Sequence, residues 1–242
     1  MRFQSKTVIV TGGAGGIGLA IATRFASEGA NIVLTGHNMA HLQQAADHLK
    51  SSNIWLSLCD VSKEPDVEAT VKGAIERFGS LDIVVNNAGL MIFKKLEEHT
   101  QEDWNSVLNV DLMGAFYFTK HSFLNMKKGG VIINISSIHA LETTPMVTTY
   151  AAAKAAVLSL TRSSAIEGKE KGLRVNAILP GAIDTPMLWD NPNVKSGLEQ
   201  ISMDSVGKPE DIAGVAAFLA SDDAAFVQGA MIEVDGGRLG RL

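Results

Sequence analysis

The sequence predicts a doubly wound α/β fold, in which helices cover both faces of a parallel seven-stranded sheet. Short runs rich in Val, Ile and Leu alternate with longer segments of helical period, as expected for buried parallel strands separated by helices. The first run leads directly into a glycine-rich turn and a helical segment. The 242 residues, with 46% hydrophobic side chains, can form one large core. We therefore expect a single domain over residues 1–242.

Turn and capping residues mark the predicted elements. Thr100 and Asp103 have the spacing of a helix capping box, and Ser62 and Pro209 stand at or just inside predicted helix starts. Predicted helix ends fall at Gly29, Gly79, Gly129 and Gly172. The predicted strands cover residues 7–11, 32–35, 54–58, 81–85, 131–135, 173–178 and 231–234.

The segment 185–204 is the least regular part of the chain. It contains Pro186, Pro192 and Gly197, and it is long for an ordinary connection between a strand and a helix. Long connections of this kind often cover a binding site. We therefore interpret the segment as a candidate substrate lid.

Composition argues against several kinds of partner. The formal net charge is −5 and the Lys and Arg residues are scattered, so we expect no nucleic-acid partner. No apolar run reaches membrane-spanning length and no signal-type cleavage site follows Met1, which predicts no membrane partner and a cytoplasmic location. The one cysteine, Cys59, lies in an apolar run and is interpreted as a buried strand thiol.

The glycine-rich turn after the first predicted strand is a candidate phosphate site. It contains Gly12, Gly16, Ile17 and Gly18. Glycines permit a tight turn with close backbone approach, and the free N–H groups at a helix start attract an anion. A P-loop is excluded because no Gly-Lys-Ser/Thr follows. The turn alone is a weak signal and also fits an ordinary strand-to-helix connection.

Tyr150 and Lys154 are spaced to act as a proton donor and its charged neighbour. Residues four apart on a helix lie on one face, so the Lys154 ammonium can sit beside the Tyr150 phenol. Lowering a phenol pKa of about 10 by roughly 3 units takes about 4 kcal/mol. One charge at roughly 4 Å, in an effective dielectric near 20, supplies about that much. Lys154 is therefore expected to lower the pKa of Tyr150 toward neutrality.

Taken together, these motifs resemble the short-chain dehydrogenase/reductase family over nearly the whole chain. The resemblance implies a Rossmann-type fold, an NAD(P) cofactor, and hydride transfer between nicotinamide C4 and a carbonyl or alcohol carbon of a small-molecule substrate. The matching motifs are Thr11-Gly-x-x-x-Gly-Ile-Gly18, Asp60-Val61, Asn86-Asn-Ala-Gly89, Ser136-Ser137, Tyr150-x-x-x-Lys154, Pro180-Gly181, Thr185 and Asp235-Gly236-Gly237.

The resemblance also implies roles for individual residues. Tyr150 would be the general acid in reduction and the base in oxidation, Ser137 would orient the substrate oxygen, and Lys154 would bind the nicotinamide ribose. Implied cofactor contacts besides Tyr150 and Lys154 are Gly12, Gly16, Ile17, Gly18, Gly36, His37, Asp60, Val61, Asn86, Gly89, Pro180, Gly181, Ile183 and Thr185.

One departure from the family pattern concerns its fourth catalytic residue. The asparagine that holds a water in the family's proton relay aligns with Asp111. Asn109 lies two residues earlier, about 200° around a helix, and so does not substitute for it. We expect Asp111 to take the relay position, where a buried carboxylate would change the local charge.

A second departure bears on the choice of cofactor. NAD-preferring members usually carry an acidic residue at the end of the second strand, where it binds ribose hydroxyls and repels a 2′-phosphate. Here that position is Gly36, followed by His37 and Asn38. The missing acid favours NADP(H) over NAD(H), although the basic residues typical of NADP binding are also missing.

Residues of the substrate site are predicted near the catalytic serine and in the candidate lid, namely His139, Met187 and Trp189. A small neutral secondary alcohol, a sugar-like compound or a cyclic ketone is the expected substrate. The alternatives are a 3-oxoacyl carrier-protein reductase and a non-catalytic dinucleotide-sensing protein. A methyltransferase also uses a glycine turn but does not need Ser137 and Tyr150.

Two further expectations concern metals and assembly. His37, His41 and His48 have helical spacings, but no carboxylate or cysteine completes a ligand set, so no metal site is predicted. The helix predicted near 149–168 is rich in Ala and Ser, which permits close helix packing. By resemblance to the family, we expect a homotetramer.

Overall fold

The structure is a computed structural model that describes residues 1–49, 51 and 53–240. Across these residues it forms a parallel sheet in the order β3-β2-β1-β4-β5-β6-β7, which confirms the predicted doubly wound fold. The strands are β1 (Thr7–Thr11), β2 (Asn31–Gly36), β3 (Ile54–Leu58), β4 (Ile83–Asn86), β5 (Val131–Ile135), β6 (Arg174–Pro180) and β7 (Met231–Val234).

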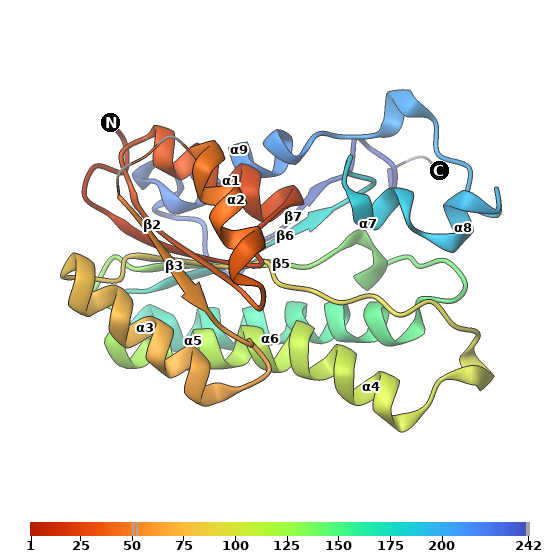
Figure 1. Cartoon of the computed structure of the whole chain (residues 1–242), viewed down its shortest axis with the longest axis horizontal. Helices are drawn as coiled ribbons and strands as arrows, with labels where there is room; N and C mark the ends of the chain where they lie inside the picture. Colours follow the sequence, from red (N-terminus) through yellow and green to blue (C-terminus); the bar gives the residue numbers. More distant parts are fainter. Residues whose placement is uncertain (50, 52, 241–242) are drawn as a thin grey trace.

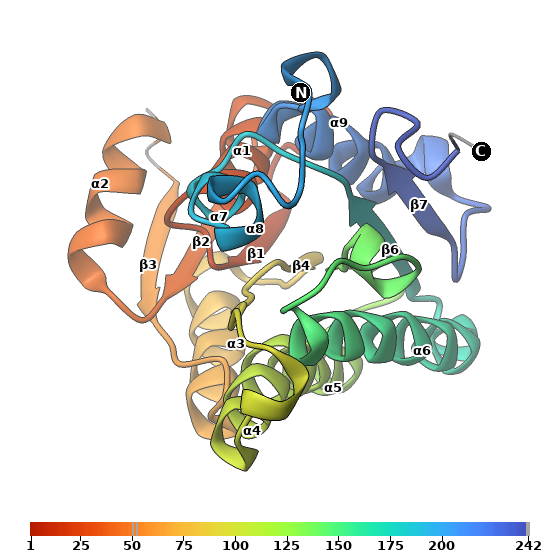
Figure 2. The same cartoon turned by 90° about the vertical axis from the view of Figure 1, so that its right-hand side faces the viewer.

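Helices cover both faces of the sheet in two layers (Figure 1). One layer consists of α1 (Gly16–Ser27), α2 (Met39–Leu49) and α9 (Pro209–Ala220). The other consists of α3 (Glu64–Phe78), α4 (Gln101–Leu108), α5 (Gly114–Asn125) and α6 (Thr148–Lys171). The view in Figure 2 shows the same two layers above and below the strands.

The side chains of each strand alternate between two hydrophobic cores, as the pleat of a sheet requires. In β1, Val8 and Val10 pack into the core that also contains Phe25. Ile9, between them, packs into the opposite core with Phe118. All five side chains are fully buried. Burial on both faces explains why the strands read as continuous apolar runs in the sequence.

Most predicted helix boundaries are confirmed. The hydroxyl of Thr100 accepts from the N–H of Asp103 at 3.2 Å, and the Asp103 carboxylate accepts from the N–H of Thr100 at 2.8 Å, which is the predicted capping box. Pro209 is the first residue of α9. The φ angles at Gly79 and Gly172 are 86° and 69°, in the left-handed region that glycine favours at a helix end.

Several boundaries differ from the prediction, such as α5, which ends at Asn125 rather than at Gly129. Polar side chains explain two of the differences. The fourth strand begins at Ile83 rather than residue 81, because the Asp82 carboxylate accepts from the Thr7 N–H and the Ser80 hydroxyl. Helix α3 begins at Glu64 rather than near Ser62, since the Ser62 hydroxyl donates to Asp60 at 2.6 Å instead of capping the helix.

The segment 185–204 is more ordered than predicted. It contains two short helices, α7 (Pro186–Trp189) and α8 (Pro192–Lys195), and leads into a 3₁₀ turn at Met203–Ser205. The prolines at 186 and 192 begin these helices rather than preventing them, because proline is favoured in a first helical turn. Figure 2 shows α7 and α8 beside one another near the ends of the strands.

Two smaller expectations can be compared directly with the fold. Cys59 follows β3 and is buried as predicted, and burial raises the pKa of its thiol to about 11. Among the helices of the described residues, none combines the length and apolarity needed to cross a membrane.

Candidate active site

The candidate site lies at the carboxyl ends of β1 and β4, which are neighbours in the sheet although their connections leave in opposite directions. Ligands of open parallel sheets bind at such a switch point. The buried hydroxyl of Thr11 accepts from the backbone N–H of Asn87 at 2.8 Å and of Ala88 at 2.9 Å. The Asn87 amide donates back to the Thr11 carbonyl at 2.9 Å. These bonds hold the two strand ends together.

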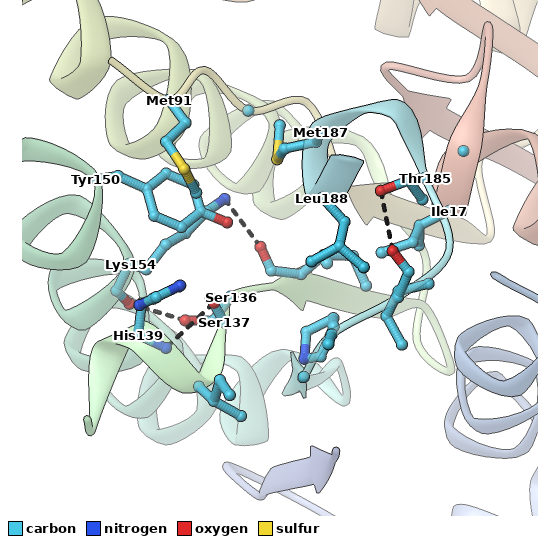
Figure 3. A pocket seen from close by; sticks show the side chains of 18 of the residues that line it. Ile17, Met91, Ser136, Ser137, His139, Tyr150, Lys154, Thr185, Met187 and Leu188 are labelled. Atoms are coloured by element: carbon cyan, nitrogen blue, oxygen red, sulfur yellow. Dashed lines mark hydrogen bonds between the residues drawn. The ribbon is translucent and has the colours of Figure 1, made fainter. Parts of the chain in front are cut away.

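A cavity of about 370 Å³ opens at this point. It runs from the glycine-rich turn to Ser137, Tyr150 and Lys154, and Figure 3 shows these three side chains around its wall together with residues of α7. The cavity also reaches His139 and the segment 180–188. The glycine motif and the Ser-Tyr-Lys motif therefore belong to one site.

Tyr150 and Lys154 lie one turn apart near the start of α6, and both side chains are buried. The Lys154 ammonium is 5.3 Å from the centre of the Tyr150 ring and donates to the carbonyl of Ile135 at 3.2 Å. The Ser136 hydroxyl donates to the Lys154 carbonyl at 2.9 Å. The end of β5 thus fixes both the backbone and the side chain of the lysine.

Asp111 pairs directly with this lysine. Its Oδ2 is 3.1 Å from the Lys154 Nζ, and its Oδ1 accepts from the Leu90 N–H at 2.7 Å. Asp111 lies in a π turn, Asn109–Met113, between α4 and α5. A π turn inserts one extra residue per turn and is frequent at functional sites. A Cβ at Gly89 would lie 3.2 Å from Asp111 Oδ2 and 3.3 Å from Lys154 Nζ, so the glycine leaves room for the ion pair.

The three buried groups change one another's pKa values. Burial is the largest single effect on Lys154 and acts to lower its pKa, but the charge and hydrogen bond of Asp111 together with the charge of Tyr150 outweigh it, so the pKa is raised and the ammonium stays charged. Burial raises the pKa of Asp111 against the effect of Lys154. The expectation that the pKa of Tyr150 is lowered was wrong. Burial raises it, Lys154 lowers it and Asp111 raises it further, so the pKa lies above the usual value of a phenol.

Ser137 and His139 lie at the other end of the catalytic group. The Ser137 hydroxyl accepts from the N–H of His139 at 3.1 Å and acts to lower the pKa of Tyr150. The rings of His139 and Tyr150 meet edge to face, with centres 6.0 Å apart. Burial lowers the pKa of His139, so this imidazole is neutral at neutral pH. Ser137, Tyr150 and His139 thus lie together in the structure, and their predicted roles in catalysis and substrate binding stay predictions.

The glycine-rich turn has the geometry of an anion site. Helix α1 begins at Gly16 with no side-chain cap on its first N–H groups. Gly12 and Gly16 have φ angles of 60° and 50°. Nothing lies within 4 Å of a Cβ built at Gly15, which lines the cavity. A Cβ at Gly18 would lie 2.4 Å from the Gly12 carbonyl, so Gly18 lets the helix approach the turn rather than lining the cavity.

Most of the predicted cofactor residues line the cavity, namely Gly12, Gly16, Ile17, Gly89, Tyr150, Lys154, Pro180, Gly181, Ile183 and Thr185. Of the predicted substrate residues, His139 and Met187 line it. The residues that sequence reasoning missed include Gly15, Asn87, Met91, Leu188, Glu199 and Arg238. Asn87 is adjacent to a predicted residue within the same motif, whereas Glu199 and Arg238 carry no motif.

Asn86 is a correction to the prediction. Its amide donates to Asn134 at 2.8 Å and to the Ala115 carbonyl at 3.4 Å, so it points into the core between β4, β5 and α5. Strand alternation makes the following residue, Asn87, face the cavity. Trp189 is a second correction, because its indole N–H donates to Asp184 at 2.7 Å and the side chain is absent from the cavity wall, where Leu188 stands instead.

The residues predicted for the adenosine end lie outside this cavity. Gly36 and His37 are at the end of β2, with His37 exposed, and Asp60 and Val61 follow β3. The Asp60 carboxylate accepts from Ser62, which lowers its pKa. Val61 is buried and packs against Gly114. Their part in binding remains a prediction.

The chain matches known proteins over almost its full length. A family model described as enoyl-(acyl carrier protein) reductase matches residues 12–238. A 3beta-hydroxysteroid dehydrogenase 1 of Eggerthella lenta is 40% identical over 244 residues, covering 97% of this chain and 94% of the relative. A 3-oxoacyl-[acyl-carrier-protein] reductase FabG of Chlamydia trachomatis is 40% identical over 241 residues, covering 96% and 97%. The chain belongs to the short-chain dehydrogenase/reductase family.

Solved structures agree with this membership. Levodione reductase has a TM-score of 0.93 and 34% identity, with 100% of both chains covered. A short-chain dehydrogenase from Burkholderia cenocepacia J2315, solved in complex with NADP, has a TM-score of 0.90 and 29% identity, with 98% of both chains covered. This short-chain dehydrogenase/reductase is an oxidoreductase that acts on alcohols or carbonyl compounds.

The Asp111 carboxylate is expected to set the pH dependence of the reaction. Asp111→Asn removes a negative charge that raises the pKa of Tyr150, while its amide oxygen can still accept from Leu90. The tyrosinate, which is the expected base in alcohol oxidation, then forms at lower pH. The acidic limb of the kcat/KM profile for oxidation should therefore move to lower pH by about one unit.

The control is Asp47→Asn, which removes an exposed carboxylate of α2 outside the cavity wall and should leave the profile in place. An Asp111→Asn profile that coincides with the wild type, or that moves to higher pH, would contradict the assigned electrostatic effect.

Proposed function

We propose that this enzyme reduces the carbonyl group of a small neutral substrate with NADPH, and that Tyr150 donates the proton. One observation carries the proposal: Ser137, Tyr150 and Lys154 share a cavity with the glycine-rich turn. The raised pKa of Tyr150 favours this direction, because a phenol that keeps its proton near neutrality is a donor rather than a base.

The cavity fits a dinucleotide in three respects. The uncapped first N–H groups of α1 can bind the pyrophosphate. Gly15 leaves open space in the wall, where a side chain would intrude. At the far end, the Lys154 ammonium supplies donors for ribose hydroxyls. Nicotinamide, when bound, supplies the hydride. The nicotinamide carboxamide would be held by the part of the wall formed by Pro180, Gly181, Ile183 and Thr185.

The side chains around the proposed carbonyl have distinct tasks. Ser137 donates a hydrogen bond to the carbonyl oxygen and orients it, and Tyr150 transfers its proton to that oxygen as charge develops. Lys154 stabilises the resulting tyrosinate through its charge. The N–H of His139 already donates to the Ser137 oxygen, which leaves the serine proton free for the substrate.

Asp111 is proposed to take the relay position of the family asparagine. Its direct contact with Lys154 at 3.1 Å gives it a second effect, since the carboxylate offsets part of the lysine charge that acts on Tyr150. In this proposal Asp111 receives or returns the proton that replenishes the tyrosine, through the lysine and a water. The geometry that supports it is the ion pair and the absence of any side chain at Gly89.

The preference for NADPH rests on the end of β2. No carboxylate stands at Gly36 to repel a 2′-phosphate. The hydroxyl of Thr35 is buried without a partner among the described residues, and the side chain of His37, two residues later, is exposed. The Burkholderia relative was solved in complex with NADP, which supports the same choice.

A second candidate is the reduction of a 3-oxoacyl group on a carrier protein. The Chlamydia relative, at 40% identity, bears that name. An acidic carrier protein would need basic residues near the cavity mouth. In the proposed lid, segment 185–204, Lys195 instead pairs with Asp190 at 2.8 Å. Turnover of a 3-oxoacyl thioester well above that of simple ketones would favour this candidate.

A homotetramer is proposed for the assembly. Along α6, the residues Ala152, Ala155, Ser159 and Ser163 form an exposed stripe of small side chains at helical spacing, continued by Ile166 at 75% exposure. On the neighbouring α5, Phe116 and Leu124 are also exposed. Small residues let helices of two subunits approach closely, and apolar ones favour burial. Sedimentation velocity measures the mass directly.

Tyr150→Phe is the decisive test of the proposed chemistry. The change removes one oxygen and its proton while keeping the ring that packs against His139. We expect kcat for ketone reduction to fall by roughly 10²- to 10⁴-fold, with the Kd for NADPH changed less than about threefold. Stopped-flow absorbance and fluorescence titration measure the two effects. Full activity in this variant would remove Tyr150 as the proton donor.

Gly36→Asp is expected to reverse the cofactor preference. A Cβ at Gly36 lies 3.4 Å or more from its nearest neighbour, the Leu42 side chain, so the new residue fits. Its carboxylate should weaken NADPH binding by about tenfold or more and affect NADH much less. The matched control is Gln44→Glu, which adds the same charge on an exposed site of α2. Tighter NADH than NADPH binding by the wild type would overturn the preference.

A further inference from the structure

Two charged residues without any motif stand in the cavity wall. Glu199 comes from the proposed lid and Arg238 from the tail that follows β7. Arg238 Nη2 donates to Glu199 Oε1 at 2.5 Å, and the Glu199 side chain is only 9% exposed. The proposed catalysis uses neither residue. A buried carboxylate in a cavity wall needs an explanation, because burying a charge is costly unless it is fully paired.

The Glu199 carboxylate is only half satisfied. Oε1 accepts from Arg238, but Oε2 is buried and has no hydrogen-bond partner among the residues described. On the other side of the pair, a guanidinium has five N–H donors, and the bond to Glu199 uses one. Both residues line the cavity, so the pair combines a buried carboxylate oxygen that lacks a partner with unused guanidinium donors at the cavity wall.

The backbone holds both residues in place. The Glu199 N–H donates to the Asn193 carbonyl at 2.9 Å. The Asp235 carboxylate accepts from the N–H groups of Gly237 and Leu239 at 2.9 and 2.8 Å, which fixes the turn that carries Arg238. The arrangement is therefore built into the lid and the tail.

The pair lies near the catalytic group. The charge of Glu199 raises the pKa of His139 and the charge of Arg238 lowers it, so both act on the imidazole whose ring meets Tyr150 edge to face. The wall of the same cavity also contains apolar side chains, among them Met91, Ile138, Met187 and Leu188. Figure 3 shows Met91, Met187 and Leu188 on the wall around Tyr150.

We propose that Glu199 and Arg238 form a second polar subsite that binds a hydroxyl group of the substrate, remote from the reacting carbonyl. A hydroxyl can donate to the Glu199 carboxylate and accept from Arg238 at once. A substrate ammonium would be repelled by the Arg238 guanidinium, and a substrate carboxylate would be repelled by Glu199, so neither charged group fits. The substrate class is thus a neutral hydroxyketone with an apolar body. This inference rests on the proposed carbonyl reduction and narrows its substrate.

Matched ketones test the subsite. Cyclohexanone is compared with 3- and 4-hydroxycyclohexanone, and 2-decalone with its ring-hydroxylated derivatives, which vary the distance between the carbonyl and the hydroxyl. The wild type should prefer at least one hydroxylated ketone by roughly tenfold to one-hundredfold in kcat/KM, the range for a hydrogen bond to a charged group. Glu199→Leu should abolish this preference and leave the ketones without a hydroxyl nearly unchanged.

Two further variants complete the test. Glu199→Gln keeps an acceptor oxygen and should keep part of the preference. Asp190→Leu makes the same acid-to-leucine change in an exposed ion pair of the lid, outside the cavity wall, and should keep all of it. Two results would contradict the proposed subsite: an equal loss of rate for hydroxylated and plain ketones in Glu199→Leu, or no preference of the wild type for a hydroxyl among either the cyclohexanones or the decalones. The pair would then only connect the lid to the tail.

Binding is measured separately from turnover. Saturation-transfer NMR of the same compounds should show the hydroxylated ketone contacting the wild type more strongly than Glu199→Leu. If no ketone is reduced, the proposed function fails, and the NMR comparison still decides the subsite. If ketones are reduced without any preference for a hydroxyl in rate or in binding, the inference alone fails.

Discussion

The active site depends on the burial of one cation, the Lys154 ammonium, at the end of a parallel sheet. An ammonium in that position needs an opposite charge and further hydrogen-bond partners. Asp111 supplies the charge and the Ile135 carbonyl accepts a hydrogen bond. Gly89 has no side chain, and a side chain at that position would crowd both charged groups. The π turn that carries Asp111 inward and the strand end that carries Ile135 thus meet at the same nitrogen.

Because of the same ion pair, the pKa of Tyr150 differs from what its closeness to Lys154 alone implies. A lone lysine would lower the pKa of Tyr150, whereas a lysine already paired with a buried carboxylate does so less effectively. Burial and Asp111 together leave the pKa raised. The charge of the group is therefore shared among three side chains, two from α6 and one from the π turn, and no one of them can be changed without altering the other two.

Much of the fold and of the catalytic group was predictable from the sequence, for physical reasons that also explain the errors. Strands that are buried on both faces consist of continuous apolar residues. The sequence therefore predicted the limits of each strand to within about two residues of those in the structure. The glycine turn and the spacing of Ser137, Tyr150 and Lys154 are local patterns, and the structure brings both to one cavity. Asn86 was misplaced because strand alternation turns it into the core and its neighbour outward.

Long-range contacts were beyond the reach of sequence reasoning. The π turn is not marked by any residue type, and the pairing of Glu199 with Arg238 joins positions from the lid and the tail. The pKa of Tyr150 required a sum over burial and two charges, which the spacing of residues does not contain.

The strand order also determines at which point of synthesis the sheet can be completed. β1 lies between β2 and β4, so the centre of the sheet cannot close until residue 86 has been made. The outer strand β7 and Arg238 are made only after more than a hundred further residues. Parallel strands that are distant in sequence pair slowly. Until they pair, their unpaired edges can aggregate with other chains. The cavity, with walls drawn from residue 12 to residue 238, is thus incomplete until residue 238 has been made.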